Sequence, residues 1–311
     1  MRILHLSDTT LSGSPIRIVD VINKHTEHEA RHLVWQKVFG YRKFKTDLVG
    51  EVMPVEELAD WVDWADILHF HNRYNTSKIL EAIGIAPPKK PTVVQIHSPR
   101  KSERFDLDDK SGVKLAVVAQ YHVREWPELD FIVPNVVDFT EPEYQQKKSY
   151  RKAMPIVSYS PSNCICGGWD NKGYGHVAPL LKRLGIKRTI AYDPIVNRPH
   201  DVAMKLKARA DLGIDEFMTG SYHLSGLEYL AMGVGCFCHV DEIAEKVVKD
   251  LTGCKDLPWI DTNVDKFKGD LLRVIRKKAW PIYGQESREW IEKYWYPEFL
   301  AKCYIDMYQS L

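Results

Sequence analysis

The sequence of 311 residues lacks an excess of charge of either sign. Its 43 lysines and arginines face 42 aspartates and glutamates, which leaves a formal net charge of +1. Without a basic excess, the whole chain exerts no general attraction on nucleic acid or on an anionic membrane surface. Any site that binds an anion must therefore be local.

The sequence also lacks a long apolar segment, a repeat of solenoid period and a low-complexity segment. No run approaches the roughly 20 apolar residues that span a bilayer. Residues 1–8 have the pattern of a short buried strand rather than of a signal peptide. We therefore expect a cytoplasmic protein without a transmembrane segment, with peripheral membrane contact as the alternative.

Cysteine is scarce, with six residues in the chain. Four of them form two Cys-x-Cys pairs, Cys164 with Cys166 and Cys236 with Cys238. The second pair lies in an apolar run typical of a strand, so alternation places both thiols on one face. We interpret the cysteines as free thiols in the core, because structural zinc sites more often use longer spacers. A zinc site is the alternative.

The chain does have an ordinary globular composition, with 44% hydrophobic and 27% charged residues. Short apolar runs alternate with amphipathic segments, which predicts an α/β fold with mostly parallel sheets and helices on both faces. The length predicts two domains, and the polar stretch 138–154 is the best linker candidate. We predict Rossmann-like domains at 1–145 and 146–284, and a bent helix at 285–311 that packs back toward the first domain.

The apolar runs and their spacing place the individual elements. The predicted strands are residues 2–6, 32–35, 67–71, 91–97, 115–119, 131–135, 155–159, 188–192, 211–215 and 235–239. The predicted helices are 56–64, 76–83, 177–184, 202–210 and 224–232, with one more after Pro15.

Loops after the strands are the first place to look for function, because ligands bind at the carboxyl ends of parallel strands. Ser12 and Gly13 precede a predicted helix, where backbone N–H groups of small residues can approach a phosphate. A plain tight turn is the alternative. The glycine-containing loop after strand 155–159 runs from Ser160 to Gly173 and includes Asn163 and Lys172. It is typical of a diphosphate cradle whose ammonium offsets developing charge, with a solvated loop as the alternative.

The most specific motif lies in residues 210–235. The segment Leu227-Glu-Tyr-Leu-Ala-Met-Gly233 resembles the end of the Glu-x7-Glu motif in retaining glycosyltransferases of family four, and Glu228 takes the place of the second glutamate. Gly220 stands where the first glutamate usually is. Asp215, Gly220 and Tyr222 also resemble a variant, Asp-x4-Gly-x-Tyr-Gly, from which only His223 departs. Segments 66–72 and 133–138 resemble other stretches of the family.

The resemblance implies a GT-B fold, with two Rossmann-like domains facing across a cleft. It implies transfer of a hexose from a nucleotide-sugar donor, a UDP- or GDP-sugar, with retention of configuration and with no required cofactor or metal. In this alignment His97 approaches the donor sugar, and Asp215 substitutes for the missing carboxylate. Glu228 binds the ribose, and the other residues implied at the donor are Ser12, Gly13, Asn163, Lys172, Gly220, Ser221, Tyr222, His223 and Leu224.

The acceptor is not named by the sequence. A glycan, a lipid-linked molecule and a small molecule all remain open, and nucleic acid is a less favoured candidate. Basic residues at Lys89, Lys90, Arg100, Lys101 and Arg104 are compatible with a polyanion, although a solvated face is the usual meaning of such a stretch. Three further functions are compatible with the same fold: a sugar phosphorylase, a nucleotide-sugar epimerase and a degenerate nucleotide-sugar-binding module.

Overall fold

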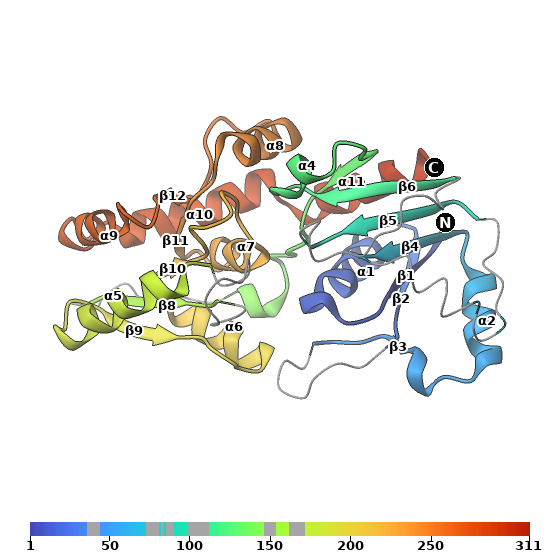
Figure 1. The fold of residues 1–311 in the computed structure, drawn as a ribbon, viewed down its shortest axis with the longest axis horizontal. Helices are drawn as coiled ribbons and strands as arrows, with labels where there is room; N and C mark the ends of the chain where they lie inside the picture. Colours follow the sequence, from blue (N-terminus) through green and yellow to red (C-terminus); the bar gives the residue numbers. More distant parts are fainter. Residues whose placement is uncertain are drawn as a thin grey trace. The chain divides into compact units, whose positions relative to one another are not determined.

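The structure is a computed structural model, and it describes residues 1–35, 44–72, 81, 84, 90–98, 112–145, 154–161 and 172–311. The chain divides into two compact units (Figure 1). The first contains residues 1–136 and 297–311, and the second contains residues 137–296. Each unit is built around one parallel sheet.

The first unit holds a seven-stranded sheet in the order β3-β2-β1-β4-β5-β6-β7. All its neighbouring strands run parallel. The strands are β1 (Arg2–Ser7), β2 (Glu29–Val34), β3 (Leu48–Val49), β4 (Ile67–His71), β5 (Thr92–Ile96), β6 (Val113–Val118) and β7 (Phe131–Val133). The strand order reverses between β1 and β4, and such a switch point is where open parallel sheets bind ligands.

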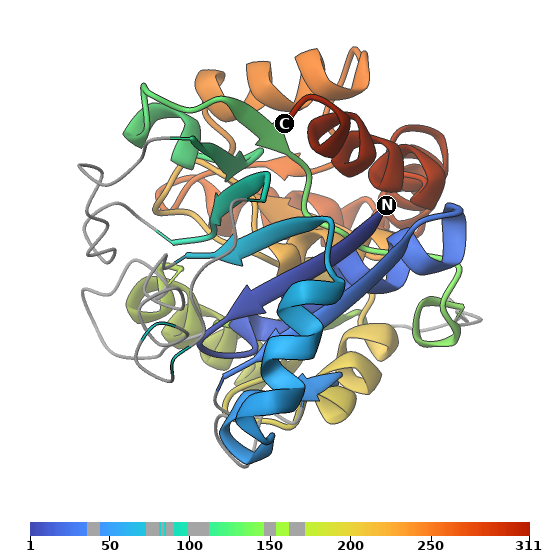
Figure 2. The ribbon, with the colours of Figure 1, turned by 90° about the vertical axis from the view of Figure 1, so that its right-hand side faces the viewer.

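The two faces of this sheet have different chemistry. Helix α2 (Val55–Trp64) covers an apolar face, on which Leu4 and Leu6 of β1 pack with Leu58. Figure 2 shows α2 in front of the strands. Helices α1 (Ser14–His25) and α11 (Pro297–Gln309) pack against each other. The hydroxyls of Tyr308 and Tyr304 on α11 contact polar side chains of the strands, His69 of β4 and Gln95 of β5 respectively. The short helix α4 (His122–Glu125) packs beside β6.

The second unit holds a five-stranded parallel sheet in the order β12-β11-β10-β8-β9. Its strands are β8 (Ile156–Tyr159), β9 (Ala191–Pro194), β10 (Leu212–Ile214), β11 (Gly235–Cys238) and β12 (Ile260–Asp261). Helices α5 (Tyr174–Ile186) and α9 (Phe267–Arg276) share one apolar cluster with the strands. The helices α6 (His200–Arg209), α7 (Leu224–Ala231) and α10 (Trp280–Tyr294) also pack against this sheet, and α8 (Glu242–Thr252) follows β11. The order reverses between β8 and β10.

The predicted α/β class with parallel sheets is confirmed. The strand predicted at 188–192 was misplaced, because Arg188 has a positive φ of 52° and the N–H of Thr189 bonds back to Leu184 O, so β9 starts only at Ala191. The helices α8 and α9 and the short strands β3 and β12 were not predicted. The predicted C-terminal helix is two helices, α10 and α11, and Pro297 begins the second.

Some predictions lie outside the described residues. The predicted helix 76–83 is one of them, since only Glu81 of it is described. Among the helices that the structure does describe, none combines the length and the apolar character needed to cross a bilayer.

Candidate functional site

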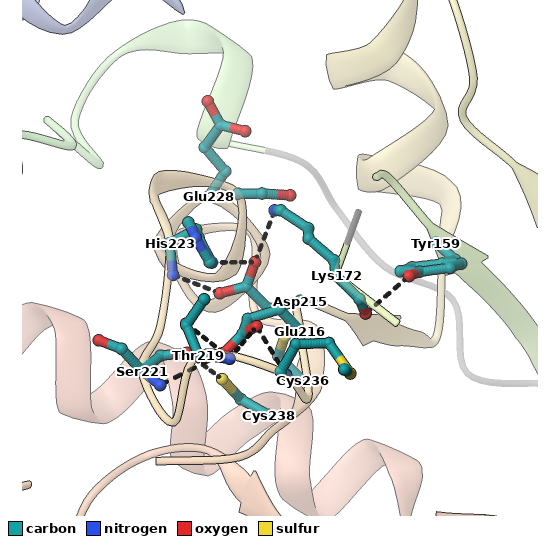
Figure 3. Close-up of polar contacts among 12 residues, drawn as sticks. Tyr159, Lys172, Asp215, Glu216, Thr219, Ser221, His223, Glu228, Cys236 and Cys238 are labelled. Carbon is teal, nitrogen blue, oxygen red and sulfur yellow. Dashed lines mark hydrogen bonds and ion pairs between the residues drawn. The ribbon is translucent and has the colours of Figure 1, made fainter. Parts of the chain in front are cut away.

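A buried ion pair lies at the switch point of the second sheet. Lys172 precedes α5, and Asp215 follows β10. The Lys172 Nζ atom donates to Asp215 Oδ1 at 2.9 Å, and the two side chains are 2% and 0% exposed (Figure 3). Lys172 has a positive φ of 56°, and its carbonyl accepts a hydrogen bond from the Tyr159 hydroxyl at 2.8 Å. The local backbone thus turns the lysine inward, under the start of α5.

The Asp215 carboxylate also fixes the start of α7. Its Oδ2 atom accepts the backbone N–H of His223 at 2.5 Å, and His223 is the N-cap residue of that helix. A Cβ atom added at Gly226 would lie 2.5 Å from the same oxygen, so glycine makes room for the carboxylate. One acidic group therefore joins β10, α7 and the lysine before α5.

A second buried pair joins α6 to α7. Lys207 Nζ donates to the Glu228 carboxylate and to Ser225 Oγ, the latter at 2.8 Å. The ammonium also lies 5.0 Å from the centroid of the Tyr229 ring, whose hydroxyl accepts from Ser158 at 2.9 Å. Burial lowers the pKa of Lys207, while the Glu228 carboxylate acts to raise it. The sequence analysis did not single out Lys207. This lysine lies with Met204 and Ala208 on the buried side of α6, and a charged residue at a buried helix position was a signal that could have identified it.

These two pairs are electrostatically coupled, since Lys172 and Asp215 both act on the ammonium of Lys207. Taking charges out of water is expensive, and a buried ion pair contributes little net stability compared with well-packed apolar residues. Clusters of buried charge at the ligand-binding edge of a sheet are therefore candidates for function rather than for folding.

Glu216 organises the loop between β10 and α7. Its carboxylate accepts backbone N–H groups from Met218 at 2.8 Å, Thr219 at 2.9 Å and Ser221 at 3.2 Å. This residue was not singled out from the sequence. By accepting three N–H groups of one loop, the carboxylate fixes the backbone that leads from β10 into α7.

Gly220 has a steric reason to be glycine. Its φ is +67°, and a Cβ atom there would lie 2.5 Å from Asp241 Oδ2. Asp241 caps α8 by accepting the N–H of Ile243 and of Ala244. A carboxylate from α8 thus occupies the space into which the glutamate of the usual motif would project.

Replacing Gly220 with alanine is expected to lower the free energy of unfolding by about 2–3 kcal/mol, because positive φ is strained for alanine and the Cβ atom collides with Asp241. Gly253→Ala is the matched control. Gly253 has a similar φ of +72° but nothing within 4 Å of the added Cβ, so only the backbone strain of about 1 kcal/mol is expected. Urea unfolding measures both, and equal losses would contradict the steric explanation.

The other predicted residues of this loop have different surroundings. Tyr222 is fully buried, and its ring stacks on Trp259 with centroids 4.7 Å apart. Ser221 is also fully buried. The His223 side chain is 13% exposed and lies 3.8 Å from Asp215 Oδ1, and Leu224 begins α7. The structure thus gathers Lys172, Asp215 and His223 at one place, whereas the Tyr222 ring packs in the core.

The predicted residues of the first unit lie at its own sheet edge. Ser12 and Gly13, with φ values of 56° and 78°, form the turn between β1 and α1. His97 follows β5, and its Nδ1 atom lies 3.3 Å from Ser14 Oγ at the start of α1. Its Nε2 atom lies 2.8 Å from His71 Nδ1. Burial lowers the pKa of His97 to about 3, so the ring is neutral near pH 7.

Behind His97 lies a group of buried histidines. Among the residues that the structure describes, His5, His69 and His71 are the only group of three or more side chains placed to share a metal ion. The sequence analysis noted the strand that carries two of them but assigned them no role.

Cys236 and Cys238 are buried free thiols on β11, as predicted. Burial raises the pKa of both thiols, so they stay protonated, and Cys238 donates to Ser221 O at 3.3 Å. Lys90 donates to three carbonyls at the end of α2, which accounts for one residue of the basic stretch. Asn163, Cys164, Cys166, Lys89, Arg100, Lys101 and Arg104 lie outside the described residues.

Comparison with solved structures found glycosyltransferases of similar fold. An alpha-glucosyltransferase in complex with UDP-glucose and DNA containing an abasic site has a TM-score of 0.70, with 99% of each chain covered and 11% identity. The chain has the GT-B fold. HepE of Anabaena in complex with UDP and glucose has a TM-score of 0.63, with 100% of each chain covered and 12% identity.

Sucrose-phosphate synthase from Thermosynechococcus elongatus has a TM-score of 0.56, with 100% of this chain and 99% of that chain covered and 11% identity. No protein-family model matches the sequence, and no curated protein sequence matches it. At such identities the likeness shows the GT-B fold, and membership of family four stays a prediction.

Proposed function

We propose that the protein transfers a hexose from a nucleoside-diphosphate sugar, a UDP- or GDP-sugar, to an acceptor with retention of configuration. The observation that carries this is the Lys172–Asp215 pair at the switch point of β8 and β10, with α5 and α7 starting beside it. Helix N-termini and an ammonium favour phosphate groups. Solved structures of proteins with this fold contain UDP-glucose or UDP, which supports the same class of donor.

In this proposal the second unit binds the donor and the first unit binds the acceptor. Lys172 and the amides near Gly220 hold the diphosphate and stabilise the charge that develops on the leaving group. Lys207 engages Glu228 Oε2, and the proposal assigns Glu228 Oε1, beside His200 Nε2 at 3.8 Å, to accept hydrogen bonds from the ribose hydroxyls. No metal is required, because the ammonium supplies the positive charge.

The carboxylate nearest the transferred sugar was predicted to be Asp215. Its full burial and its two hydrogen bonds fit a residue that positions Lys172 and α7. Asp241 is the second carboxylate at this loop, and its Oδ2 atom lies where a side chain at position 220 would begin. We propose that Asp241 takes the part of the missing glutamate.

The proposal is tested by nucleotide binding. Thermal stabilisation by UDP, GDP, ADP and CMP and by the corresponding sugar nucleotides would be measured, because a bound ligand raises the melting temperature by mass action. Glu228→Gln is expected to weaken binding of the preferred nucleotide about tenfold to a hundredfold, since a charged hydrogen bond contributes about 1.5–3 kcal/mol. Glu242→Gln, on the exposed start of α8, is the matched control and should bind normally.

The outcomes separate the candidate functions. Binding followed by transfer to an acceptor supports the proposal, and binding without transfer to any acceptor would favour a degenerate binding module. Absence of binding by every nucleotide would overturn the donor site.

Nucleic acid is the second candidate acceptor. The observation that favours it is the TM-score of 0.70 with a glucosyltransferase whose complexes contain DNA. Duplex DNA containing hydroxymethylated bases therefore belongs in the acceptor screen beside glycans and small alcohols, with unmodified DNA of the same sequence as its control.

A further inference from the structure

A continuous series of hydrogen bonds leads from the C-terminal helix to His97. The Tyr308 hydroxyl lies 3.3 Å from His5 Nε2, and His5 Nδ1 lies 2.9 Å from His71 Nε2. His71 Nδ1 lies 2.8 Å from His97 Nε2, and His97 Nδ1 lies 3.3 Å from Ser14 Oγ. Each imidazole uses both of its nitrogens in this series.

The histidines in the series are neutral. Burial lowers the pKa of His5 and of His71 well below the usual value, and neighbouring histidines lower it further. A neutral imidazole has one N–H group and one lone pair. The hydrogen bonds of the whole series must therefore run in one direction, either toward Ser14 or toward Tyr308.

The distances around the Tyr308 hydroxyl settle the direction. Its oxygen lies 2.7 Å from His69 Nδ1 and 3.3 Å from His5 Nε2. Hydrogen bonds donated by O–H groups are shorter than those donated by N–H groups, about 2.7–2.8 Å against about 2.9–3.0 Å. The hydroxyl therefore donates in the shorter contact and accepts in the longer one.

Tyr308 transmits this direction to the series. His69 Nδ1 therefore accepts the Tyr308 hydroxyl proton. Burial raises the pKa of Tyr308, so the phenol has this one proton to donate. Its oxygen must then accept the N–H of His5 Nε2. His5 Nδ1 in turn accepts from His71, and His71 Nδ1 accepts from His97 Nε2.

We propose that Tyr308, His5 and His71 are positioning residues that hold His97 as its Nε2–H tautomer, with the Nδ1 lone pair directed toward the turn before α1. In the structure this lone pair faces Ser14 Oγ. A hydroxyl group of a substrate sugar or acceptor that displaces Ser14 Oγ donates to the lone pair in its place and is oriented by it. His97 with a pKa of about 3 is too weakly basic to remove a proton at pH 7, so it acts as an acceptor.

A shared metal ion is the rival explanation for these histidines. The nitrogens of His5 and His71 lie 2.9 Å apart, and those of His71 and His97 lie 2.8 Å apart. Two nitrogens bound at about 2.0–2.1 Å to one tetrahedral zinc ion would be about 3.3 Å apart. The observed distances are those of direct hydrogen bonds between the rings, which suits the hydrogen-bond series.

The direct test reads the tautomers by long-range ¹H–¹⁵N NMR of the full chain labelled with ¹⁵N-histidine. His5, His71 and His97 should each show a protonated Nε2 and an unprotonated Nδ1. A wild-type His97 protonated on Nδ1 would overturn the proposal without any variant. Stoichiometric zinc in the purified protein, lost in His69→Ala, would overturn it in favour of the metal site.

Tyr308→Phe supplies the long-range test. Without the hydroxyl, His5 Nε2–H has no acceptor, and a buried N–H without a partner is less tolerated than a buried lone pair. The series should then reverse, so that His97, two imidazoles away from His5, becomes protonated on Nδ1. Met307→Leu, a buried residue of the same helix, is the matched control and should leave the tautomer unchanged. An unchanged His97 in a folded Tyr308→Phe protein would also overturn the proposal.

The effect on turnover rests on the proposed function. Tyr308→Phe should lower kcat about tenfold and leave the nucleotide dissociation constant unchanged, because the donor nucleotide is assigned to the other unit. If the tautomer of His97 switches in Tyr308→Phe but the wild type transfers no sugar, the hydrogen-bond series is supported and the proposed function is rejected. If the wild type transfers sugar but the tautomer stays unchanged in Tyr308→Phe, the proposed function is supported and the hydrogen-bond series is rejected.

Discussion

Lys172→Met should lower the free energy of unfolding by about 3–5 kcal/mol and abolish nucleotide binding. Methionine fills a similar volume but leaves the Asp215 carboxylate fully buried without its cation. Removing one partner of a buried ion pair is costly because an uncompensated charge remains in the interior. Urea unfolding and calorimetric titration with the preferred nucleotide measure the two effects.

A double variant separates stability from binding. In Lys172→Met with Asp215→Asn, the amide oxygen still accepts the His223 N–H, and no buried charge is left. Most of the lost stability should return, whereas nucleotide binding should stay absent if the ammonium itself contacts the diphosphate, as proposed. Restored binding in the double variant would contradict the role proposed for Lys172.

Acidification should destabilise the first unit well before ordinary acid denaturation. Burial lowers the pKa of a set of its histidines, to about 4 for His32, to about 3 for His97, and well below the usual value for His5, His69 and His71. The unfolded chain takes up protons on these rings below about pH 6.5, but the folded chain does not. Stability is therefore present above pH 6.5 and is lost as the pH falls toward 4.

At one pH unit below 6.5, each such histidine costs about 1.4 kcal/mol of unfolding free energy. Urea unfolding between pH 7.5 and 5 measures the slope. His32→Gln, which removes the ring that meets Ser7 Oγ, should reduce the slope by about one proton, and the exposed His176→Gln on α5 is its matched control. A stability that is flat over this range would show that the rings are not held neutral.

The sequence by itself predicted the architecture because parallel α/β folds leave a local signal. Fully buried strands such as Ile67–His71 and Thr92–Ile96 appear as short apolar runs, and the helices between them have amphipathic spacing. Lys172, Gly220 and Glu228 could be singled out as candidates because they lie in loops or in a motif with recognisable spacing. The strands β3 and β12 were missed because two residues each are too few to show an alternating pattern. The helix α9 was missed although its buried residues Phe267, Leu271 and Val274 recur at helical spacing, so its signal was usable.

Only the tertiary structure decided which polar residues meet. Lys207 and Glu228 stand 21 residues apart on different helices, and Asp241 reaches the space beside Gly220 because α8 starts there. His5 and Tyr308 are 303 residues apart, and they meet because the strand register aligns His5 with His69 and α11 packs over them. A sequence pattern reports the burial of a residue through its neighbours along the chain. The partner of a buried polar group is set instead by strand order and helix packing, which bring distant segments together.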